Sequence, residues 1–341
     1  MQPEREMTGL LLQRYHHWLT STFLDSPMCV GGPRSIVCDD AGEIVGFLGV
    51  VPRQVQLGDR IYRGTAGSNF CIKPGRRGPL GLQMARQFLA ISSELAFIDE
   101  LTDNTRVLWD RLGLTAMPQS TRWTLPIRPA QHVLSLIRQK LPGTLATVAR
   151  PVAAAMDRFA AALPHSPFQY PPVSVVAEDL SPAQLARLLT EFGGKDFLRP
   201  VTTDGSTVWL VERARSMKQH GRLYMIGLRD SDGVLVGWYV YYAKPGGTGE
   251  VLDLVGTQAS SGVVLRHLAK HARDQGVVNL TGRLDPTFLT PLSDLWAVIS
   301  PRPMVTRWLH VHSRRPEIIE AFWRNKVLLS RLDGEWCQHF E

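Results

Sequence analysis

The sequence predicts an α/β protein of two similar domains, each a mixed, mostly antiparallel sheet flanked by helices, with a helical connector joining them. Its 341 residues are too many for one typical domain and enough for two that bury separate cores. Runs rich in β-branched and aromatic residues alternate with stretches whose apolar residues recur every three or four positions. A hairpin pattern near the start also returns in the second half. We therefore expect domains over 1–125 and 173–341, with the connector over 126–172.

The first domain is expected to begin with a helix and to continue as an antiparallel meander. Apolar residues at helical spacing predict a helix over 8–24. Two hairpins follow, one turning at 39–42 and the other at 58–59, and they lead into a strand that stops at Lys73. Helical spacing resumes near Leu80, so a loop rich in glycine and arginine separates this strand from the next helix.

This loop, residues 74–79, is the leading candidate for a ligand site. The N-terminus of a helix presents backbone N–H groups that have no partner inside the helix. Arg76 and Arg77 add two guanidinium groups at the same place. Together these groups suit a phosphate. The alternative is an ordinary solvent-facing turn between a strand and a helix.

The loop and a later stretch resemble two motifs of the GNAT acyltransferase superfamily. The first motif is the strand-loop-helix pattern P-x-x-R-G-x-G, and the matching residues are Pro74, Arg77, Gly78, Gly81 and Leu82. The second is the family's later helix, written N-x-x-(A)-x-x-(L)-Y-x-x-x-G-F, which residues 104–114 resemble. The sequence departs from the pattern where Leu80 takes the place of the second loop glycine and where Trp109 stands for the tyrosine of many members.

The resemblance implies transfer of an acetyl or longer acyl group from coenzyme A, or from an acyl carrier protein, to an amine. The acceptors that it allows are an amino sugar, a lipid precursor and an amino acid. The backbone of residues 67–72 would pair with pantetheine and supply donors for the thioester oxyanion. The residues implied to bind the cofactor, acetyl-CoA or acyl-CoA, are Phe70, Cys71, Ile72, Arg76, Arg77, Gly78, Leu80, Gly81, Asn104 and Trp109. We interpret the Cys71 thiol as packing rather than as a nucleophile, since no histidine is near it in the sequence.

The resemblance leaves open which residues donate and accept protons during the transfer. Trp109 replaces the tyrosine that often serves as general acid in the family, and an indole N–H is a poor acid. Candidate carboxylates follow the predicted strand 95–98, at the strand end where open α/β sheets bind ligands. The candidates are Asp99, Glu100 and Asp103 in the first domain and Asp253 in the second. Each can act as a base or hold a cationic amine, and each can instead be a helix cap or a surface carboxylate.

The connector is expected to be helical rather than a loose linker. Its apolar residues recur at helical spacing between prolines and predict helices over 131–141 and 144–163. Basic residues make these helices cationic as well as amphipathic, which suggests contact between residues 126–163 and an anionic membrane surface. The alternative is that the helices pack on the flanking domains and leave the arginines in solvent.

The second domain repeats the order of elements in the first. A hairpin turning at 230–233 is followed by a strand over 250–255 and a helix over 263–275. The turn before this helix, 257–262, has no arginine, so we expect the cofactor on the first domain. A tandem pair of GNAT-like domains also resembles the Fem-type aminoacyltransferases, which implies aminoacyl transfer from tRNA as an alternative function. A further alternative is a non-catalytic module that binds a carrier protein or a membrane enzyme.

The composition favours a cytoplasmic protein that can lie at the inner face of the membrane. No apolar run has the length of a membrane span, and the first residues lack the apolar core of a secretory signal. Four cysteines are scattered without histidine clusters, so no metal site is indicated. The charge of +7 suits an anionic cofactor, an acidic membrane surface or nucleic acid. No zinc-finger or RNP-like aromatic signature accompanies it, and this absence disfavours nucleic acid as a partner. Residues 332–336 read as a turn to which we assign no chemistry.

Overall fold

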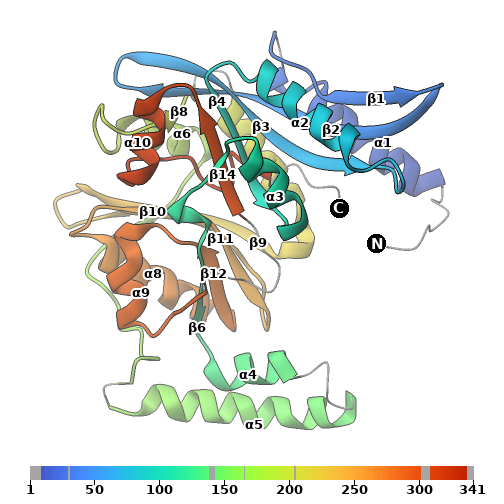
Figure 1. Cartoon of the computed structure of the whole chain (residues 1–341). Coiled ribbons are helices and arrows are strands. Elements are labelled where there is room, and N and C mark those ends of the chain that lie inside the picture. Colours follow the sequence, from blue (N-terminus) through green and yellow to red (C-terminus); the bar gives the residue numbers. More distant parts are fainter. Residues whose placement is uncertain are drawn as a thin grey trace. The chain divides into compact units, whose positions relative to one another are not determined.

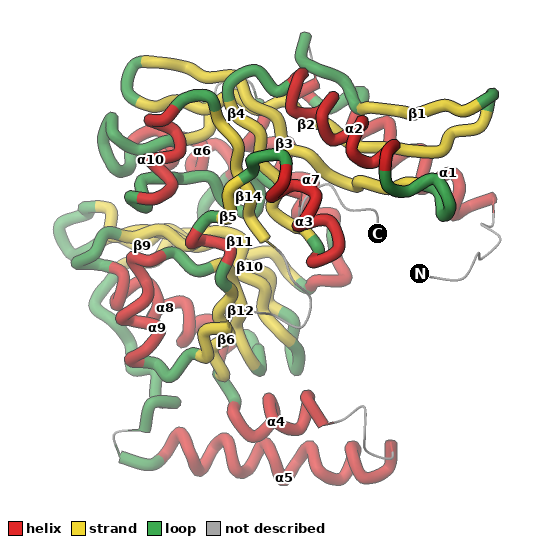
Figure 2. Tube along the Cα trace, in the orientation of Figure 1, coloured by secondary structure: helices red, strands yellow, loops and turns green. Residues whose placement is uncertain are grey.

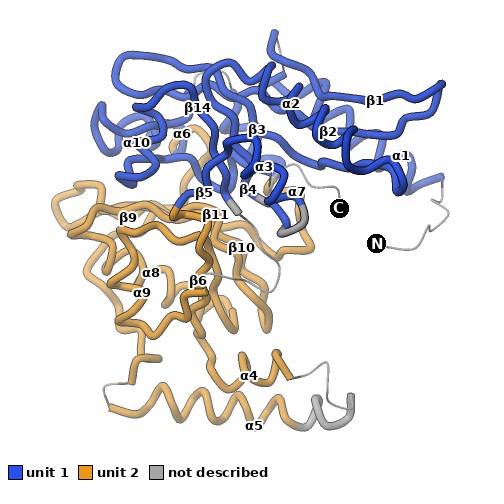
Figure 3. The backbone as a smooth tube through the Cα atoms, viewed as in Figure 1, with its two compact units in different colours: residues 1–117, 185–213, 306–341 blue, residues 118–184, 214–305 orange. Residues whose placement is uncertain are grey.

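The computed structural model describes residues 9–29, 31–137, 143–164, 166–202, 205–300 and 308–335. The chain forms two compact units, coloured separately in Figure 3. Unit 1 comprises residues 1–117, 185–213 and 306–341, and unit 2 comprises residues 118–184 and 214–305. These units cut the chain at other places than the domains 1–125, 126–172 and 173–341 expected from the sequence, because unit 1 takes up segments from the second half.

Unit 1 is a mixed sheet with helices on its faces (Figure 1). From the first half it takes α1 (Gly9–Phe23), η1 (Pro27–Cys29), β1 (Ile36–Asp40), β2 (Glu43–Leu57), β3 (Arg60–Ile72), α2 (Pro79–Ile91), β4 (Leu95–Leu101), α3 (Asp103–Arg111) and β5 (Thr115–Ala116). From later in the chain it takes β8 (Arg199–Pro200), β14 (Trp308–Ser313), α10 (Pro316–Trp323) and most of α6 (Pro182–Glu191) and α7 (Ser206–Ser216). The strand order is β1-β2-β3-β4-β14-β5, with β8 on β2. Paired strands run antiparallel except for β3 and β4.

Unit 2 has a second mixed sheet, drawn in yellow among its red helices in Figure 2. Its elements are η2 (Pro118–Ser120), β6 (Arg122–Pro126), α4 (Pro129–Ile137), α5 (Gly143–Ala162), β7 (Val176–Asp179), η4 (Lys218–His220), β9 (Arg222–Arg229), β10 (Leu235–Ala243), β11 (Thr248–Gly256), α8 (Ser261–Asp274), β12 (Asn279–Arg283), η5 (Pro286–Phe288), α9 (Leu289–Asp294) and β13 (Val298–Ser300). The strand order is β13-β6-β12-β11-β10-β9-β7. As in unit 1, one pair is parallel, here β11 with β12.

Each sheet is completed by a strand from the other half of the sequence. β14 comes late in the chain and lies between β4 and β5, while β6 comes early and lies between β12 and β13. Backbone groups at a sheet edge need partners, and this exchange gives them to β4 and β12. The exchange explains why the compact units are not continuous in sequence.

The two hairpins predicted in the first half share one long strand. β2 runs unbroken from Glu43 to Leu57, through Pro52, and forms one arm of each hairpin. One edge of β2 pairs with β3 along its length. The other edge pairs with β1 as far as Leu48 and with β8 at Val55 and Gln56, so at Pro52 it faces neither β1 nor β8. A proline is tolerated there because no ladder hydrogen bond is needed on the open side.

Apolar side chains pack on both faces of the unit 1 sheet. One cluster joins α2 and α3 to the sheet through Met84, Phe88 and Trp109. The other joins α10 to the opposite face through Ile318 and Phe322. Each fully buried side chain of this size contributes roughly 1.5–3 kcal/mol relative to an exposed one. Together these clusters fix where the end of β3, the loop after it and α3 lie.

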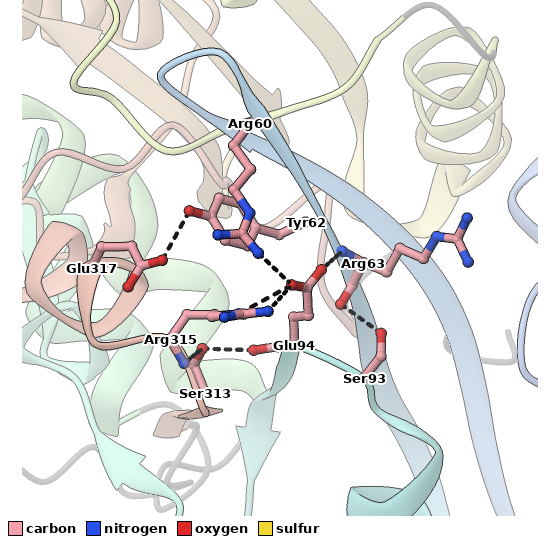
Figure 4. A network of polar contacts seen from close by, with 8 residues as sticks. All are labelled: Arg60, Tyr62, Arg63, Ser93, Glu94, Ser313, Arg315 and Glu317. Atoms are coloured by element: carbon pink, nitrogen blue, oxygen red, sulfur yellow. Dashed lines mark hydrogen bonds and ion pairs between the residues drawn. The ribbon is translucent and has the colours of Figure 1, made fainter.

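A polar network fastens the start of β4 to the exchanged segment (Figure 4). The Glu94 carboxylate accepts hydrogen bonds from the backbone N–H of Arg63 at 3.0 Å and from Arg315 Nε at 3.1 Å, and pairs with Arg60 at 3.5 Å. Its backbone carbonyl accepts the Ser313 hydroxyl at 2.6 Å. The Arg63 amide, with Arg315 beside it, holds the pKa of Glu94 below its usual range. β3, β4 and β14 are therefore joined by charge as well as by the sheet ladder.

Candidate functional site

β3 and β4 separate toward the loop that the sequence singled out. Within these fully described strands, pairing joins Gly64–Ala66 to Leu95–Phe97 and goes no further. β3 continues to Ile72 with only β2 beside it. The backbone of residues 67–72 on the β4 side is therefore left out of the ladder. This is the splayed strand that the sequence resemblance implied.

A bulge bends β3 where the separation begins. The register between β2 and β3 shifts between Phe47 and Gly49, opposite Asn69. Asn69 has a φ of 51°, in the left-handed region that asparagine tolerates better than most residues. Because bulges re-aim the backbone, the N–H of Asn69 donates to the Glu335 carboxylate, at 2.9 Å, and not to a neighbouring strand.

The loop after β3 is shaped by two glycines with different roles. Gly78 is the N-cap of α2 with a φ of 95°, a conformation that favours glycine, and nothing lies within 4 Å of the position of a Cβ there. Gly81 lies inside the first turn, where a Cβ would come within 3.0 Å of Ile72 Cδ1. Gly78 thus opens the loop to a ligand, and Gly81 lets α2 pack close to the end of β3.

The two loop arginines are not equivalent. Arg76 forms an ion pair with Asp40 of β1, and the neighbouring Lys73 forms one with Glu43. Arg77 is exposed and, within the described ranges, makes no ion pair. Arg77, together with the first amides of α2, is therefore the positive group that an anion can use without breaking a protein contact.

Trp109 fills the core beside the splayed strand. Its side chain has no exposed surface, and its ring lies 5.8 Å from that of Phe70 and 5.6 Å from that of Phe88. The indole Nε1 has no hydrogen-bond partner among the described residues. A buried donor without an acceptor costs about 1–3 kcal/mol. A bound group that offers an acceptor beside Phe70 would recover that cost.

Cys71, expected to pack, instead has an exposed side chain whose Sγ–H donates to the carbonyl of Asn69 at 3.2 Å. The strand separation explains this, because the end of β3 has a neighbour on one side only. Within the described residues, no cluster of three or more histidine, cysteine or acidic side chains could hold a metal ion. In the same residues no helix has both the length and the hydropathy to cross a membrane.

The predicted carboxylates are placed differently from one another. Asp99 lies within β4 and is 2% exposed. Glu100 is the next residue of β4, and Asp103 begins α3 with Asn104 after it, but these three side chains lie outside the described part. Asp253 lies in β11 of unit 2, where its carboxylate accepts the Trp238 indole N–H at 2.7 Å. Among the predicted carboxylates whose side chains are described, Asp99 and not Asp253 lies beside the splayed strand.

Asp99 is contacted by the turn near the end of the described chain to which the sequence analysis assigned no chemistry. The backbone N–H of Glu335 donates to Asp99 Oδ1 at 2.5 Å, and the Glu335 carboxylate accepts the backbone N–H of Asn69 at 2.9 Å. Residue 334 lies so close to Asp99 that a Cβ would overlap its carboxylate, so any other residue there would displace either the carboxylate or the turn. Residues 330–335 thus bridge β3 and β4 beyond their last paired residues. The turn-like composition was visible in the sequence, but no local signal shows where a turn docks.

The same turn is anchored on β2. Arg53 is 5% exposed and its Nε donates to the carbonyl of Asp333 at 2.9 Å. The Asp333 carboxylate accepts the Ser330 amide at 2.9 Å. Burial raises the pKa of Asp333, and Arg53 opposes that rise. Asp99, Asp333 and Glu335 therefore gather three buried carboxyl groups around the end of the parallel pair.

A cavity of about 590 Å³ borders this cluster within unit 1. The charged and polar side chains that line it include Arg53, Gln54, Arg63, Thr65 and Asp333. Met28, Ile91 and Leu210 add apolar walls. A lining of this kind suits a small polar ligand that carries charge.

No protein-family model matches the sequence, and no curated protein matches it. Solved structures, in contrast, resemble the chain in fold. A conserved protein from Enterococcus faecalis V583, titled a probable N-acyltransferase, has a TM-score of 0.51 and 12% identity over 91% of this chain and 66% of its own length. A GCN5-related N-acetyltransferase from Anabaena variabilis ATCC 29413 has a TM-score of 0.52 and 12% identity over 93% of this chain and 74% of its own.

These similarities show that the chain has the GNAT fold. The α/β class and the GNAT-like architecture expected from the loop and the later helix are confirmed. The likeness to Fem-type proteins stays a prediction. At 12% identity the fold is established, and the chemistry has to be argued from the residues of this chain.

Proposed function

We propose that the protein is an N-acyltransferase that moves an acyl group from coenzyme A to an amine. The observation that carries the proposal is the separation of β3 from β4 directly before a glycine loop and the N-terminus of α2. A free strand edge suits an amide-containing chain such as pantetheine, and a helix N-terminus suits a pyrophosphate. The fold is the one shared with the acetyltransferase from A. variabilis.

The residues present fit acyl-CoA in three ways. Space is open above Gly78, the cation of Arg77 makes no ion pair within the described residues, and the first amides of α2 face the same loop. The backbone of residues 67–72 that faces away from β2 lies outside the ladder with β4, and a bound chain would pair there beside the contact between Asn69 and Glu335. The orphaned Trp109 donor lies beside Phe70. The same surface can accept the phosphopantetheine of an acyl carrier protein.

The acceptor would enter from the cavity that borders Asp333. Its amine nitrogen attacks the thioester carbonyl carbon, a C–N bond forms, the C–S bond breaks and coenzyme A leaves as the thiolate. The proton released by the nitrogen needs a base. Glu335 is the best-placed group, because its carboxylate already lies on an amide of the splayed strand, and Asp99 holds the Glu335 backbone. An amino sugar, a lipid precursor or an amino acid remains within the proposed acceptor class.

A thermal-shift experiment tests the donor site. Acetyl-CoA or a longer acyl-CoA should raise the melting temperature of the wild type, and Arg77→Glu with Gly78→Asp should abolish the rise. Arg86→Glu with Gly58→Asp is the matched control, since it makes the same changes at an exposed arginine of α2 and at a glycine with a φ of 63° in open space. An absence of any shift with every acyl-CoA would remove the donor assignment.

One observation favours a second candidate, a binding module without catalysis. Trp109 is fully buried and cannot supply a proton at neutral pH, and the Asn69 amide is already occupied by Glu335. Thiol release measured with acyl-CoA and a panel of amines separates the two. A module that only binds would show the thermal shift and no thiol release above background.

A further inference from the structure

The helices α4 and α5 of unit 2 form a hairpin held by a carboxylate cap. Asp157 of α5 is 5% exposed and accepts the backbone N–H groups of Ala130 at 2.7 Å and Gln131 at 3.2 Å. It thereby satisfies amides at the N-terminus of α4. Ala153, one turn earlier, is buried on the same side of α5. Ala153 and Asp157 therefore mark the side of α5 that faces α4, and the two helices lie side by side in Figure 1.

The outward face of the hairpin is apolar. Val152, Met156 and Phe159 are 57%, 59% and 68% exposed, and their spacing of four and three places them on one side of α5. On α4, Val133 and Leu136 are 55% and 65% exposed. Single exposed apolar residues are common on soluble proteins, but a continuous stripe marks an interaction surface.

The charge of the hairpin has one sign. Between positions 128 and 163 the basic residues are Arg128, Arg138, Lys140, Arg150 and Arg158, and Asp157 is the sole acid. Arg150 and Arg158 are exposed. Since Asp157 is buried in the α4 cap, the charge that the described part of the hairpin exposes is positive, and it is carried by Arg150 and Arg158 on other sides of α5 than the apolar stripe.

We infer that the α4–α5 hairpin binds an anionic lipid surface. The stripe of Val152, Met156 and Phe159 enters the boundary between headgroups and acyl chains, while the net positive charge of the hairpin attracts the anionic headgroups. A second copy of this chain is a poorer occupant, because two hairpins of the same charge would repel. The inference stands on the hairpin alone and is independent of the proposed acyl transfer.

Vesicle co-sedimentation of the full chain tests the inference. The wild type should pellet with phosphatidylglycerol-containing vesicles and remain largely in solution with phosphatidylcholine alone. Met156→Glu with Phe159→Glu should weaken binding to the anionic vesicles at least tenfold. Val176→Glu with Val234→Glu, each position 62% exposed elsewhere in unit 2, is the matched control and should bind like the wild type.

A second variant separates charge from apolar contact. Arg150→Glu with Arg158→Glu should weaken binding to anionic vesicles at least tenfold, since each basic residue near such a surface contributes about 1 kcal/mol. Circular dichroism and melting temperature check that each variant folds. Equal pelleting with both vesicle types, or wild-type binding by the stripe variant, would overturn the inference. So would sedimentation velocity showing a dimer that the stripe variant abolishes, because a second copy would then be the occupant.

Discussion

The backbone N–H of Glu335 donates a hydrogen bond to the buried carboxylate of Asp99 over 2.5 Å, across 236 positions of sequence. This contact places a turn from the far end of the described chain between strands that have just parted. It brings a second carboxylate, that of Glu335 itself, onto the Asn69 amide. The gap between the separated ends of β3 and β4 is therefore lined with the carboxylates of Asp99 and Glu335.

We expect Gly334→Ala to destabilise unit 1 by about 1–3 kcal/mol, because its methyl group would overlap the Asp99 carboxylate and force the turn outward. Urea unfolding measures the change. Gly262→Ala is the control, since its Cβ would have 4.0 Å of clearance at the start of α8, where alanine is the better helix former. A Gly334→Ala protein as stable as the wild type would contradict the docked position of the turn.

If the proposed acyl transfer holds, Glu335→Gln should lower kcat roughly a hundred- to ten-thousand-fold, the usual contribution of a positioned base. The acid limb of the pH–rate profile should disappear with it. The thermal shift with acyl-CoA should be kept, which separates loss of the base from loss of the donor site. An unchanged kcat in a protein that still shows the shift would assign the proton to another group.

Acid should weaken the network around Glu94 in a defined direction. The Arg63 amide and Arg315 hold the pKa of Glu94 below its usual value, so the folded state favours the carboxylate. This contribution is fully present above the unfolded pKa and is lost as the pH falls through the lower folded pKa. At pH 7 we expect Glu94→Gln to cost about 1.5–3 kcal/mol in urea unfolding, the range for hydrogen bonds to a charged group.

The difference between Glu94→Gln and the wild type should shrink below about pH 4. Glu320→Gln is the control, because Glu320 pairs with Arg324 on the exposed surface of α10 and should change stability by less than about 1 kcal/mol. A Glu94→Gln effect that is the same at every pH would mean that packing, and not charge, holds the start of β4.

Unit 2 should lose stability as histidines protonate. The hydroxyls of Tyr239 and Tyr241 lie 3.0 Å and 2.7 Å from Nδ1 of His267 and His271. Burial lowers the pKa of both imidazoles, so the unfolded state binds protons first, and stability falls as the pH drops through about 6.5.

Calorimetry between about pH 7.5 and pH 5 checks this expectation. The melting temperature of the wild type should fall more steeply than that of a His267→Gln, His271→Gln double variant. Tyr241→Phe is a control that removes one hydrogen bond, at about 1 kcal/mol, and keeps the wild-type slope. Parallel curves for the double variant and the wild type would exclude these histidines as the titrating groups.

Local patterns were enough to predict the parts of the fold that depend on neighbouring residues. The glycines of the loop and the helical spacing after Leu80 identified the loop and α2. Both signals are local, and the positive φ of Gly78 in the structure agrees with a turn there. The α/β class followed from the same periodicities. The separation of the end of β3 was predicted from the resemblance of the loop to the GNAT motif.

The remaining features depend on contacts that periodicity does not encode. The exchange of β6 and β14, the ion pair that engages Arg76 with Asp40, and the docking of Glu335 on Asp99 each join residues far apart in the chain. Helical spacing also predicted α5 but not which of its faces would be covered. Sequence by itself determined the loop after β3 and the strand and helix on either side of it. Only the tertiary structure decided which groups meet, because burial and pairing across long separations depend on the whole chain having folded.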